Sequence, residues 1–191
     1  WKKHNITVIP VVPSATIARK MEDAGVDAVV AEGAEAGGHI GKINTMALIP
    51  QAVDAVKIPV IAAGGIGDGR GVAAAFMLGA SGVQLGTRFL VAKECTIHHN
   101  YKQAVIDAKD TDSAITGMSS GHPVRVLKNK LTAQLEEAEK KGASPQELAA
   151  ISAGAFQKAA EDGDAEFGSI VAGQVAGLVT KEQSCKEMIV E

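Results

Sequence analysis

The sequence predicts an α/β fold built on a parallel sheet, and three observations carry this prediction. Short apolar runs, each closed by Pro, Gly or Glu, alternate with segments that have helix start and stop signals. Aromatic residues make up only 3% of the 191 residues, whereas aliphatic residues are abundant. The chain has 21 glycines, and several of them fall at the ends of the predicted strands. This combination is typical of strands that are covered on both faces.

Four strands and three helices alternate in the first half of the chain. The predicted strands are Ile6–Val12, Ala28–Glu32, Pro59–Ala63 and Gly82–Leu85. Ser14 is expected to cap a helix through about Ala24, with Gly25 as its left-handed terminator, and Thr45 to cap the next. Asp68 is expected to cap a helix over Gly69–Leu78 that ends before Gly79. Because parallel neighbours cannot be joined by a tight hairpin, this β-α-β-α-β-α-β order predicts a parallel sheet with right-handed crossovers.

The pattern changes after Phe89, and residues from about 100 to 191 are expected to form helices and loops. Leu127, Leu131 and Leu135 recur at helical spacing, and Gly142 is expected to end that helix. Ser144-Pro-Gln-Glu147 has the form of a capping box with Pro at the first helical position. A mainly helical region is therefore predicted for residues 96–191, behind a soft boundary near residue 95.

Charge and composition exclude several classes of partner. The net charge is −3 with both signs mixed along the chain, so no basic stripe is available to neutralise a nucleic-acid backbone. No run approaches the roughly 18 apolar residues of a spanning helix, and we expect a cytoplasmic protein without membrane insertion. Cys95 and Cys185 are isolated, as reduced thiols are. His98 and His99 lack the spacing of a shared metal site on a helix, and no metal is predicted.

Two strand ends carry glycines that suit a phosphate site. Gly64 and Gly65 follow one predicted strand, where backbone N–H groups can converge on an anion beside the start of a helix. Gly86 and Thr87 follow the next strand, and β/α barrels commonly share a phosphate site between their last two strands. A tight turn is the alternative for either glycine pair alone. The repetition at adjacent strands favours phosphate.

A glycine-rich loop with one histidine follows the strand that ends at Glu32. Gly37, Gly38 and His39 would lie at the same sheet edge as the phosphate glycines, because the carboxyl ends of parallel strands share one edge. A lone histidine in such a loop is more often solvated than catalytic. Its position beside a bound ligand makes catalysis the better interpretation. No partner for His122, in the loop Gly117–Arg125, can be identified from sequence, and its role stays open.

The ordered motifs carry a family resemblance. They are Ala-Glu-Gly-Ala-Glu-Ala-Gly-Gly-His-Ile-Gly, Ile-Pro-Val-Ile-Ala-Ala-Gly-Gly-Ile-Gly-Asp-Gly, Val-Gln-Leu-Gly-Thr-Arg-Phe and Gly-His-Pro-Val-Arg-Val-Leu-Lys-Asn-Lys. Together they resemble the FMN-dependent enoyl-acyl carrier protein reductases, whose close relatives are the nitronate monooxygenases. The resemblance covers essentially all 191 residues and implies a (β/α)₈ TIM barrel. It implies that Gly37 and Gly38 approach the flavin, that Gly64, Gly65, Gly86 and Thr87 bind the FMN phosphate, and that His39 is the active-site histidine.

The same resemblance implies an incomplete barrel, because only the last four βα units are present. A whole barrel needs about 250 residues. We therefore expect residues 1–95 to be the C-terminal half of an FMN-binding barrel, and residues 96–191 to pack on it and close the active site. Four further strands would come from an N-terminal half. Without them, we expect weak FMN binding and little turnover.

The activity that the resemblance implies is reduction of a trans-2-enoyl thioester on acyl carrier protein or coenzyme A, with NAD(P)H as reductant. Nitronate monooxygenase is the alternative enzyme, and a non-catalytic half-barrel module is the alternative of another class. The basic group Arg125, Lys128 and Lys130 is expected to be a solvated helix face, with docking of an acidic carrier as the sharper alternative. A monovalent cation requirement and a homodimer stay open.

Overall fold

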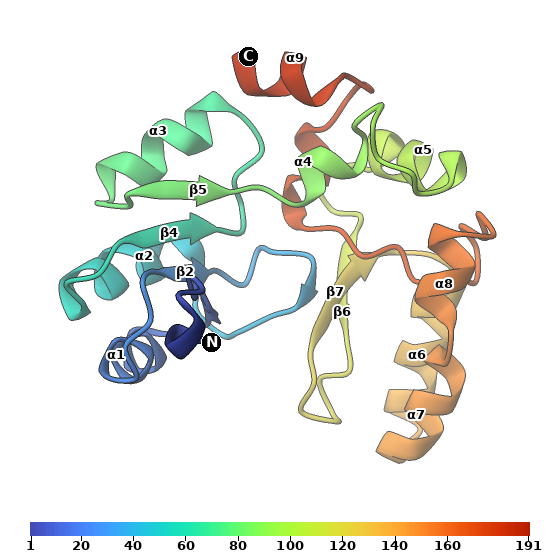
Figure 1. Ribbon diagram of the computed structural model, residues 1–191. Helices are drawn as coiled ribbons and strands as arrows, with labels where there is room; N and C mark the ends of the chain where they lie inside the picture. The colour runs from blue at the N-terminus through green and yellow to red at the C-terminus, as the bar shows by residue number, and fades with distance from the viewer. The chain divides into compact units, whose positions relative to one another are not determined.

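The computed structural model describes all residues from 1 to 191, and the chain forms two compact units (Figure 1). Unit 1 comprises residues 1–36 and 40–85, and unit 2 comprises residues 37–39 and 86–191. Each unit has its own sheet. Unit 2 resumes at Gly86, nine residues before the domain boundary that the sequence predicted near residue 95. The assignment of residues 1–95 to half of a barrel stays a prediction.

Unit 1 contains a four-stranded parallel sheet with the order β1-β2-β4-β5. Its strands are β1 (Val11–Val12), β2 (Val29–Glu32), β4 (Val60–Ala63) and β5 (Gly82–Gln84). Within this unit, each strand pairs with the strand that follows it in sequence, so the order of the strands in the sheet is their order in the chain. This is the arrangement of a β/α barrel, because a doubly wound sheet reverses its direction once. The four predicted strands are confirmed.

The first strand is shorter than predicted. Residues 6–10 lie outside β1, although the Val8 and Pro10 carbonyl oxygens still accept hydrogen bonds from the N–H groups of Asp27 and Val30. Pro10 has no N–H group to donate, and β1 has a neighbour on one side only. The regular ladder is therefore limited to the two residues after the proline.

The helices of unit 1 are η1 (Lys2–His4), α1 (Ala15–Asp23), α2 (Thr45–Ala55) and α3 (Gly69–Met77). Ser14 and Asp68 cap α1 and α3 as predicted, since each side chain accepts backbone N–H groups of the first turn. The prediction for Thr45 was wrong. Asn44 is the N-cap of α2 without a side-chain cap bond, and Thr45 is the first helical residue.

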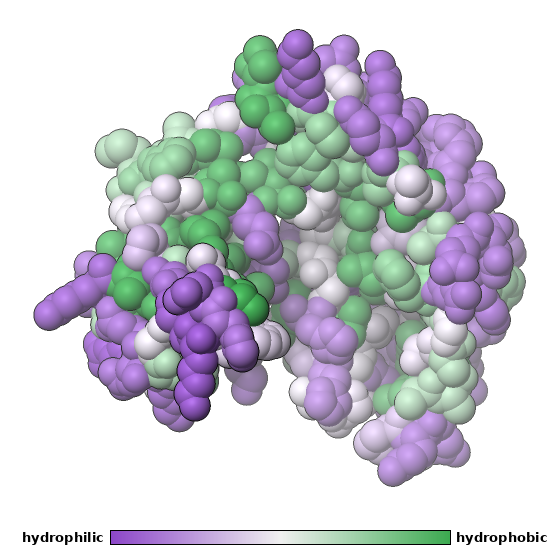
Figure 2. Space-filling view, in the orientation of Figure 1, coloured by the Kyte–Doolittle hydropathy of each residue, from purple (hydrophilic) through white to green (hydrophobic).

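The core of unit 1 lies between the sheet and its helices. α1 packs against β1 and β2, α2 against β2 and β4, and α3 against β5. Val12, Val29, Leu48 and Ile49 are fully buried in this cluster. Hydrophobic residues also gather over the outer side of α3 (Figure 2), where Phe76 and Met77 are exposed.

Unit 2 contains an antiparallel sheet that the sequence pattern did not predict. Its order is β3-β7-β6, formed by β3 (Gly38–His39), β7 (Val124–Leu127) and β6 (Ser113–Thr116). β6 and β7 form a hairpin, and β3 joins it across β7. Leu127 was predicted on a helix, but it is the last residue of β7. Leu131 and Leu135 alone continue the predicted helical face.

The helices of unit 2 are α4 (Thr87–Leu90), α5 (His99–Asp107), α6 (Lys130–Lys140), α7 (Pro145–Ser152), α8 (Ala155–Ala160), η2 (Gln174–Leu178) and α9 (Cys185–Val190). The capping box of Ser144 and Glu147 at α7 is confirmed. Gly142 follows the end of α6 with φ of 78°, as a left-handed terminator does. Leu131, Leu135 and Leu148 join Ala155 in a small core between α6, α7 and α8.

Two buried basic side chains, Arg88 and Lys102, bind the C-terminal segment to the rest of unit 2. The Arg88 guanidinium donates to Gln183 and, at 3.0 Å, to Glu191. Lys102 donates from Nζ to the Ala92 carbonyl oxygen at 2.6 Å and to the Glu182 carboxylate at 3.0 Å. Both basic side chains are about nine-tenths buried, so these contacts compensate charges that water does not reach.

None of the helices has both the length and the apolar character that crossing a membrane requires.

Candidate functional site

The strand β3 places Gly38 and His39 beside the hairpin of unit 2. Gly38 pairs with Arg125 and His39 with Val124 in antiparallel register. Gly38 has φ of 84°, a left-handed conformation that glycine adopts without strain. The histidine that was predicted in a loop therefore lies on a short strand. Its side chain is exposed, and the pairing of β3 with β7 holds its backbone.

The segment Ser169–Gln174 lies against this strand. A Cβ atom at Gly37 would lie 2.7 Å from the Ala172 carbonyl carbon, so only glycine permits this approach. The Gly173 N–H donates to Thr87 Oγ1 at 2.8 Å, and Tyr101 Oη donates to the Val171 carbonyl oxygen at 2.8 Å. Burial raises the pKa of the Tyr101 hydroxyl, which keeps it protonated as a donor.

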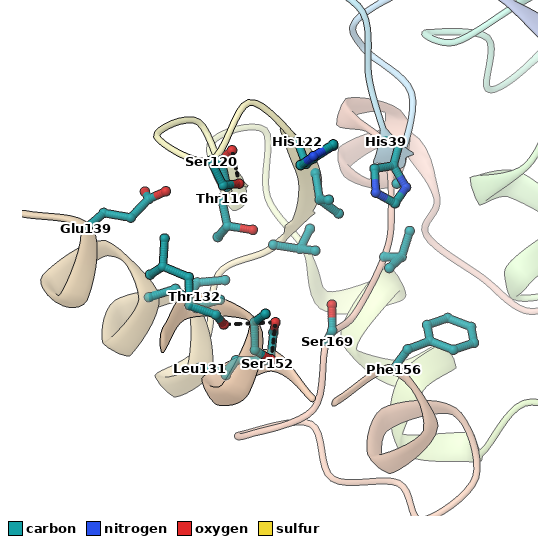
Figure 3. Close-up of a pocket in the computed structure, with 18 of the residues that line it drawn as sticks. His39, Thr116, Ser120, His122, Leu131, Thr132, Glu139, Ser152, Phe156 and Ser169 are labelled. Carbon is teal, nitrogen blue, oxygen red and sulfur yellow. Dashed lines mark hydrogen bonds between the residues drawn. The ribbon is translucent and has the colours of Figure 1, made fainter. Parts of the chain in front are cut away.

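A pocket of about 580 Å³ opens between the hairpin and the helices α6, α7 and α8 (Figure 3). This volume is within the range of ordinary small-molecule sites. All of its lining residues belong to unit 2, and most of its larger side chains are apolar. The apolar lining consists of Val124, Val126, Leu131, Leu135, Pro145, Leu148, Ala149, Phe156 and Val171.

The imidazole and carboxylate groups of the pocket lie toward its two sides. In Figure 3, His39 and His122 lie on one side and Glu139 on the opposite side. The Glu139 carboxylate accepts the Ser119 hydroxyl at 2.8 Å, which ties the hairpin tip to the last turns of α6. The pocket therefore has one side with two imidazoles and an opposite side with a carboxylate that is hydrogen-bonded to the hairpin.

Sequence reasoning missed the position of His122 and the pocket itself. His122 precedes β7 and lines the same pocket as His39. The signal was present, because Gly117 and Pro123 bracket a turn between two short alternating runs, which is a hairpin pattern. A two-residue strand such as β3 has no pattern of its own. The pairing that brings the two histidines to one pocket could not be read from the sequence.

In unit 1, two glutamates lie at the carboxyl end of β2 and in the loop that follows it. Glu32 is the last residue of β2, and burial raises the pKa of its carboxyl group. The Glu35 carboxylate accepts the Thr45 backbone N–H at 2.9 Å, and the Thr45 hydroxyl lies 2.8 Å from the Gly64 carbonyl oxygen. This chain of contacts ties the loop after β2 to the turn after β4.

The turn after β4 depends on glycine. Gly64 has φ of 84° and Gly65 has φ of 72°, and a Cβ at Gly64 would lie 2.7 Å from the Gly33 carbonyl oxygen. The start of α3 is not free, since the Asp68 carboxylate accepts the N–H groups of Arg70 and Gly71. An anion at this turn would therefore rely on the backbone N–H groups of the glycine turn and not on the end of α3.

Gly86 is a different kind of glycine. Its φ is −105°, and nothing lies within 4 Å of where a Cβ would stand. The fold of the chain therefore gives no reason for glycine there, whereas a ligand that approaches the backbone does. Gly86 precedes α4, where the Phe89 N–H already donates to the Gly86 carbonyl oxygen at 2.9 Å, so only the N–H groups before Phe89 could serve a ligand. The residues of both units thus fit the phosphate group of FMN, each unit taken by itself.

The predicted site residues are divided between the units. Gly37, Gly38, His39, Gly86 and Thr87 belong to unit 2, and Gly64 and Gly65 belong to unit 1. Their roles toward a cofactor stay predictions. The structure adds a packing role at three of the positions: Gly37 makes room for Ala172, Gly64 for Gly33, and Thr87 accepts the N–H of Gly173.

The basic group differs from its expected form. Arg125 is buried in β7, where its guanidinium donates to the Ser113 hydroxyl at 3.1 Å. Lys128 and Lys130 are exposed, and each has a partner: the Thr111 carbonyl oxygen at 2.7 Å and the Glu166 carboxylate at 2.6 Å. The three residues therefore do not form one solvated face.

A parallel sheet whose strands follow chain order, with glycine turns at their carboxyl ends, defines a protein of the β/α-barrel class. The family model of nitronate monooxygenase matches residues 1–191, and the chain belongs to this family. The family is one of oxidoreductases that use a flavin.

Two curated relatives are named probable nitronate monooxygenase. The protein of Staphylococcus saprophyticus is 42% identical over 147 residues, which are 71% of this chain and 41% of the relative. The protein of Staphylococcus aureus is 43% identical over 148 residues, which are 72% of this chain and 42% of the relative. The chain thus matches less than half the length of these relatives.

Solved structures resemble the chain over nearly all of its length. FabK from Thermotoga maritima is 44% identical with a TM-score of 0.95, and the match covers 99% of this chain and 60% of that one. Nitroalkane oxidase from Streptomyces ansochromogenes is 30% identical with a TM-score of 0.83, covering 99% of this chain and 57% of that one.

Proposed function

We propose that this chain takes part in the FMN-dependent reduction of trans-2-enoyl-acyl carrier protein with NAD(P)H. The single observation that carries the proposal is the pocket of about 580 Å³ with His39 in its wall. A reductase of acyl thioesters needs room for an aliphatic chain beside the reacting carbons. A short alkyl nitronate would fill only a small part of this volume. The similarity to FabK, 44% identical, supports the same assignment.

The chain's own residues would hold the cofactor in the following way. In unit 1, the backbone N–H groups of the turn at Gly64 and Gly65 would bind a phosphate oxygen, and in unit 2 those at Gly86 and Thr87 would do so. Gly37 and Gly38 carry no side chain that would keep the isoalloxazine ring away from β3. The chemistry that FMN supplies when bound is hydride transfer from NAD(P)H to the β-carbon of the substrate.

His39 would serve the second half of the reduction. After hydride addition at the β-carbon, the α-carbon needs a proton, and an imidazole can carry one near neutral pH. The pairing of His39 with Val124 fixes the backbone of the histidine at the pocket wall. His39 would therefore deliver or position the proton, while the apolar lining keeps water from the thioester chain.

Nitronate monooxygenase is the second candidate, favoured by the names of the curated relatives. In that reaction the same histidine would act as a base on a nitroalkane or would bind an alkyl nitronate. The two activities differ in what they consume. The complete gene product that contains this chain should consume NADH or NADPH with trans-2-octenoyl-CoA under the first proposal. Under the second, it should take up oxygen with propyl nitronate in the absence of a nicotinamide cofactor.

The non-catalytic alternative has a separate readout. An enzyme of this type binds FMN and gives a flavin absorbance spectrum after purification and reconstitution. Protein that stays colourless after incubation with FMN would support a binding module instead.

A further inference from the structure

We propose that the aliphatic tail of the substrate lies in the pocket of unit 2, and that Ala149 and Ser152 on α7 set the acyl-chain length. The inference rests on the proposed function for the identity of the thioester, but the pocket and its lining are independent of the reaction. Because Ala149 and Ser152 are both exposed and both line the pocket, larger side chains at these positions can enter it without displacing the core.

Three of the hydroxyl groups that line the pocket, those of Ser120, Thr132 and Ser152, offer a ligand little polarity. The Ser152 hydroxyl donates back to the Leu148 carbonyl oxygen at 3.1 Å, and the Thr132 hydroxyl to that of Asn129 at 2.7 Å. The Ser120 hydroxyl likewise donates to the Gly117 carbonyl oxygen at 2.9 Å. Hydroxyl groups whose protons are engaged by nearby backbone present no free donor. Together with the apolar side chains of Leu131, Leu135 and Leu148, these engaged hydroxyl groups suit an aliphatic chain better than a polar one.

The two sides of the pocket give the chain a direction. The imidazoles of His39 and His122 lie on one side, where the reacting carbons and the thioester belong (Figure 3). On the opposite side the Glu139 carboxylate lines the pocket and accepts a hydrogen bond from Ser119 of the hairpin tip. A chain that enters at His39 and extends toward Glu139 thus passes α7, where larger side chains at Ala149 or Ser152 would shorten the space that it can fill.

Phe156 is the exposed aromatic residue of the pocket lining. It belongs to α8 and lies on the His39 side of the pocket in Figure 3, and 56% of its surface is accessible. An aromatic ring left in water at the wall of an apolar pocket gains from contact with a ligand. Phe156 would therefore cover the part of the acyl chain nearest the thioester.

The test uses saturated acyl-CoA thioesters, which bind but cannot be reduced. Isothermal titration calorimetry on the complete, FMN-reconstituted gene product measures the dissociation constants of butanoyl-, octanoyl- and dodecanoyl-CoA. Each buried methylene group tightens binding by up to about fourfold. We expect octanoyl-CoA to bind the unmodified protein at least tenfold more tightly than butanoyl-CoA.

Ala149→Phe should abolish that difference while leaving butanoyl-CoA within twofold of its original affinity. Ala150→Phe is the matched control, because Ala150 is exposed on the same helix but does not line the pocket. It should leave the chain-length dependence unchanged. Ser152→Phe is the second pocket variant, and it carries the test alone if Ala149→Phe fails to show a cooperative thermal transition.

Three results would overturn the inference: no chain-length dependence in the unmodified protein, equal losses for all three thioesters in both pocket variants, or the same loss in Ala150→Phe. The outcome is separable from that of the proposed function. Chain-length-dependent binding without reduction of trans-2-octenoyl-CoA would leave the pocket assignment in place and remove the reductase. If the protein reduces trans-2-octenoyl-CoA but neither Ala149→Phe nor Ser152→Phe changes the chain-length dependence, the reductase assignment stays and the pocket assignment is removed.

Discussion

His39 lies opposite Val124 in the antiparallel pairing of β3 with β7, and both residues line the pocket of unit 2. The pairing fixes the histidine through its backbone, so its side chain can be changed without removing the strand. In the FMN-reconstituted gene product, His39→Ala should leave flavin reduction by NADH near the original rate. It should slow the following reduction of the enoyl thioester by about 10²–10⁴-fold, the usual contribution of a general acid or base. Rapid-mixing absorbance measurements separate the two half-reactions, and unchanged rates for both would remove His39 from the mechanism.

Two of the three predicted cofactor glycines of unit 2, Gly37 and Gly86, should respond to alanine in opposite ways. A Cβ at Gly37 would lie 2.7 Å from Ala172, whereas a Cβ at Gly86 would meet nothing within 4 Å. We therefore expect Gly37→Ala to destabilise the protein by about 1–3 kcal/mol. Gly86→Ala should keep the original stability and weaken FMN binding at least tenfold. Urea unfolding and fluorescence titration of FMN give the two quantities. Tight FMN binding by Gly86→Ala would show that no ligand approaches that backbone.

The Thr87 hydroxyl should stabilise the fold even in the absence of FMN. It is buried and accepts the Gly173 N–H at 2.8 Å. Thr87→Val removes the acceptor and leaves that N–H without a partner, at a cost of about 1–3 kcal/mol. Thr87→Ser retains the acceptor and should recover most of the loss. Chemical denaturation of the three proteins without FMN tests the prediction, which fails if the valine and serine variants are equally stable.

The strand order and most helix caps of unit 1 could be predicted from the sequence, because apolar runs and capping residues act locally. Ser14 and Asp68 each accept N–H groups within three residues of themselves. Thr45 misled the same reasoning, since its hydroxyl lies 2.8 Å from the carbonyl oxygen of Gly64, 19 residues away. Such a contact depends on the sheet that brings the two strand ends together.

The sheet of unit 2 could not be predicted in the same way. β3 has two residues, and β7 supplies the partner from more than 80 residues further along the chain. Leu127 happened to stand at helical spacing from Leu131, so a strand residue was assigned to the helix that follows it. The glycine-rich loop and the neighbouring strand ends were enough to predict His39 as the candidate residue. The pocket beside it could not be predicted without knowing that β6 and β7 form a hairpin.

Tyr101 should be a positioning residue for the segment behind β3. Its hydroxyl, almost wholly buried, donates to the Val171 carbonyl oxygen at 2.8 Å. Tyr101→Phe keeps the ring and deletes the donor, so the stability of the fold should fall by about 1–3 kcal/mol. The amide protons of residues 169–174 should also exchange faster with deuterium. Unchanged exchange in that segment would contradict this role, whatever the change in overall stability.

Glu32 should make the stability of the protein depend on pH. Burial raises the pKa of its carboxyl group in the folded state. The protonated form is therefore favoured by folding, and its contribution is complete below the ordinary carboxyl pKa of about 4.3. That contribution is lost as the pH rises through the raised folded value. Glu32→Gln, which cannot ionise, should become more stable relative to the original protein across this window and stay so above it. Urea unfolding between pH 4 and 8 measures the difference, and a constant difference would contradict the assignment.

The most direct test of the central claim compares two substrates on one protein. The complete gene product, reconstituted with FMN, is incubated either with NADH or NADPH and trans-2-octenoyl-CoA or with propyl nitronate and oxygen. We expect nicotinamide oxidation that depends on the enoyl thioester and yields octanoyl-CoA, with little nitronate-dependent oxygen uptake. Oxygen uptake with the nitronate, together with no thioester-dependent oxidation of either nicotinamide, would contradict the account and assign the site to nitronate oxidation.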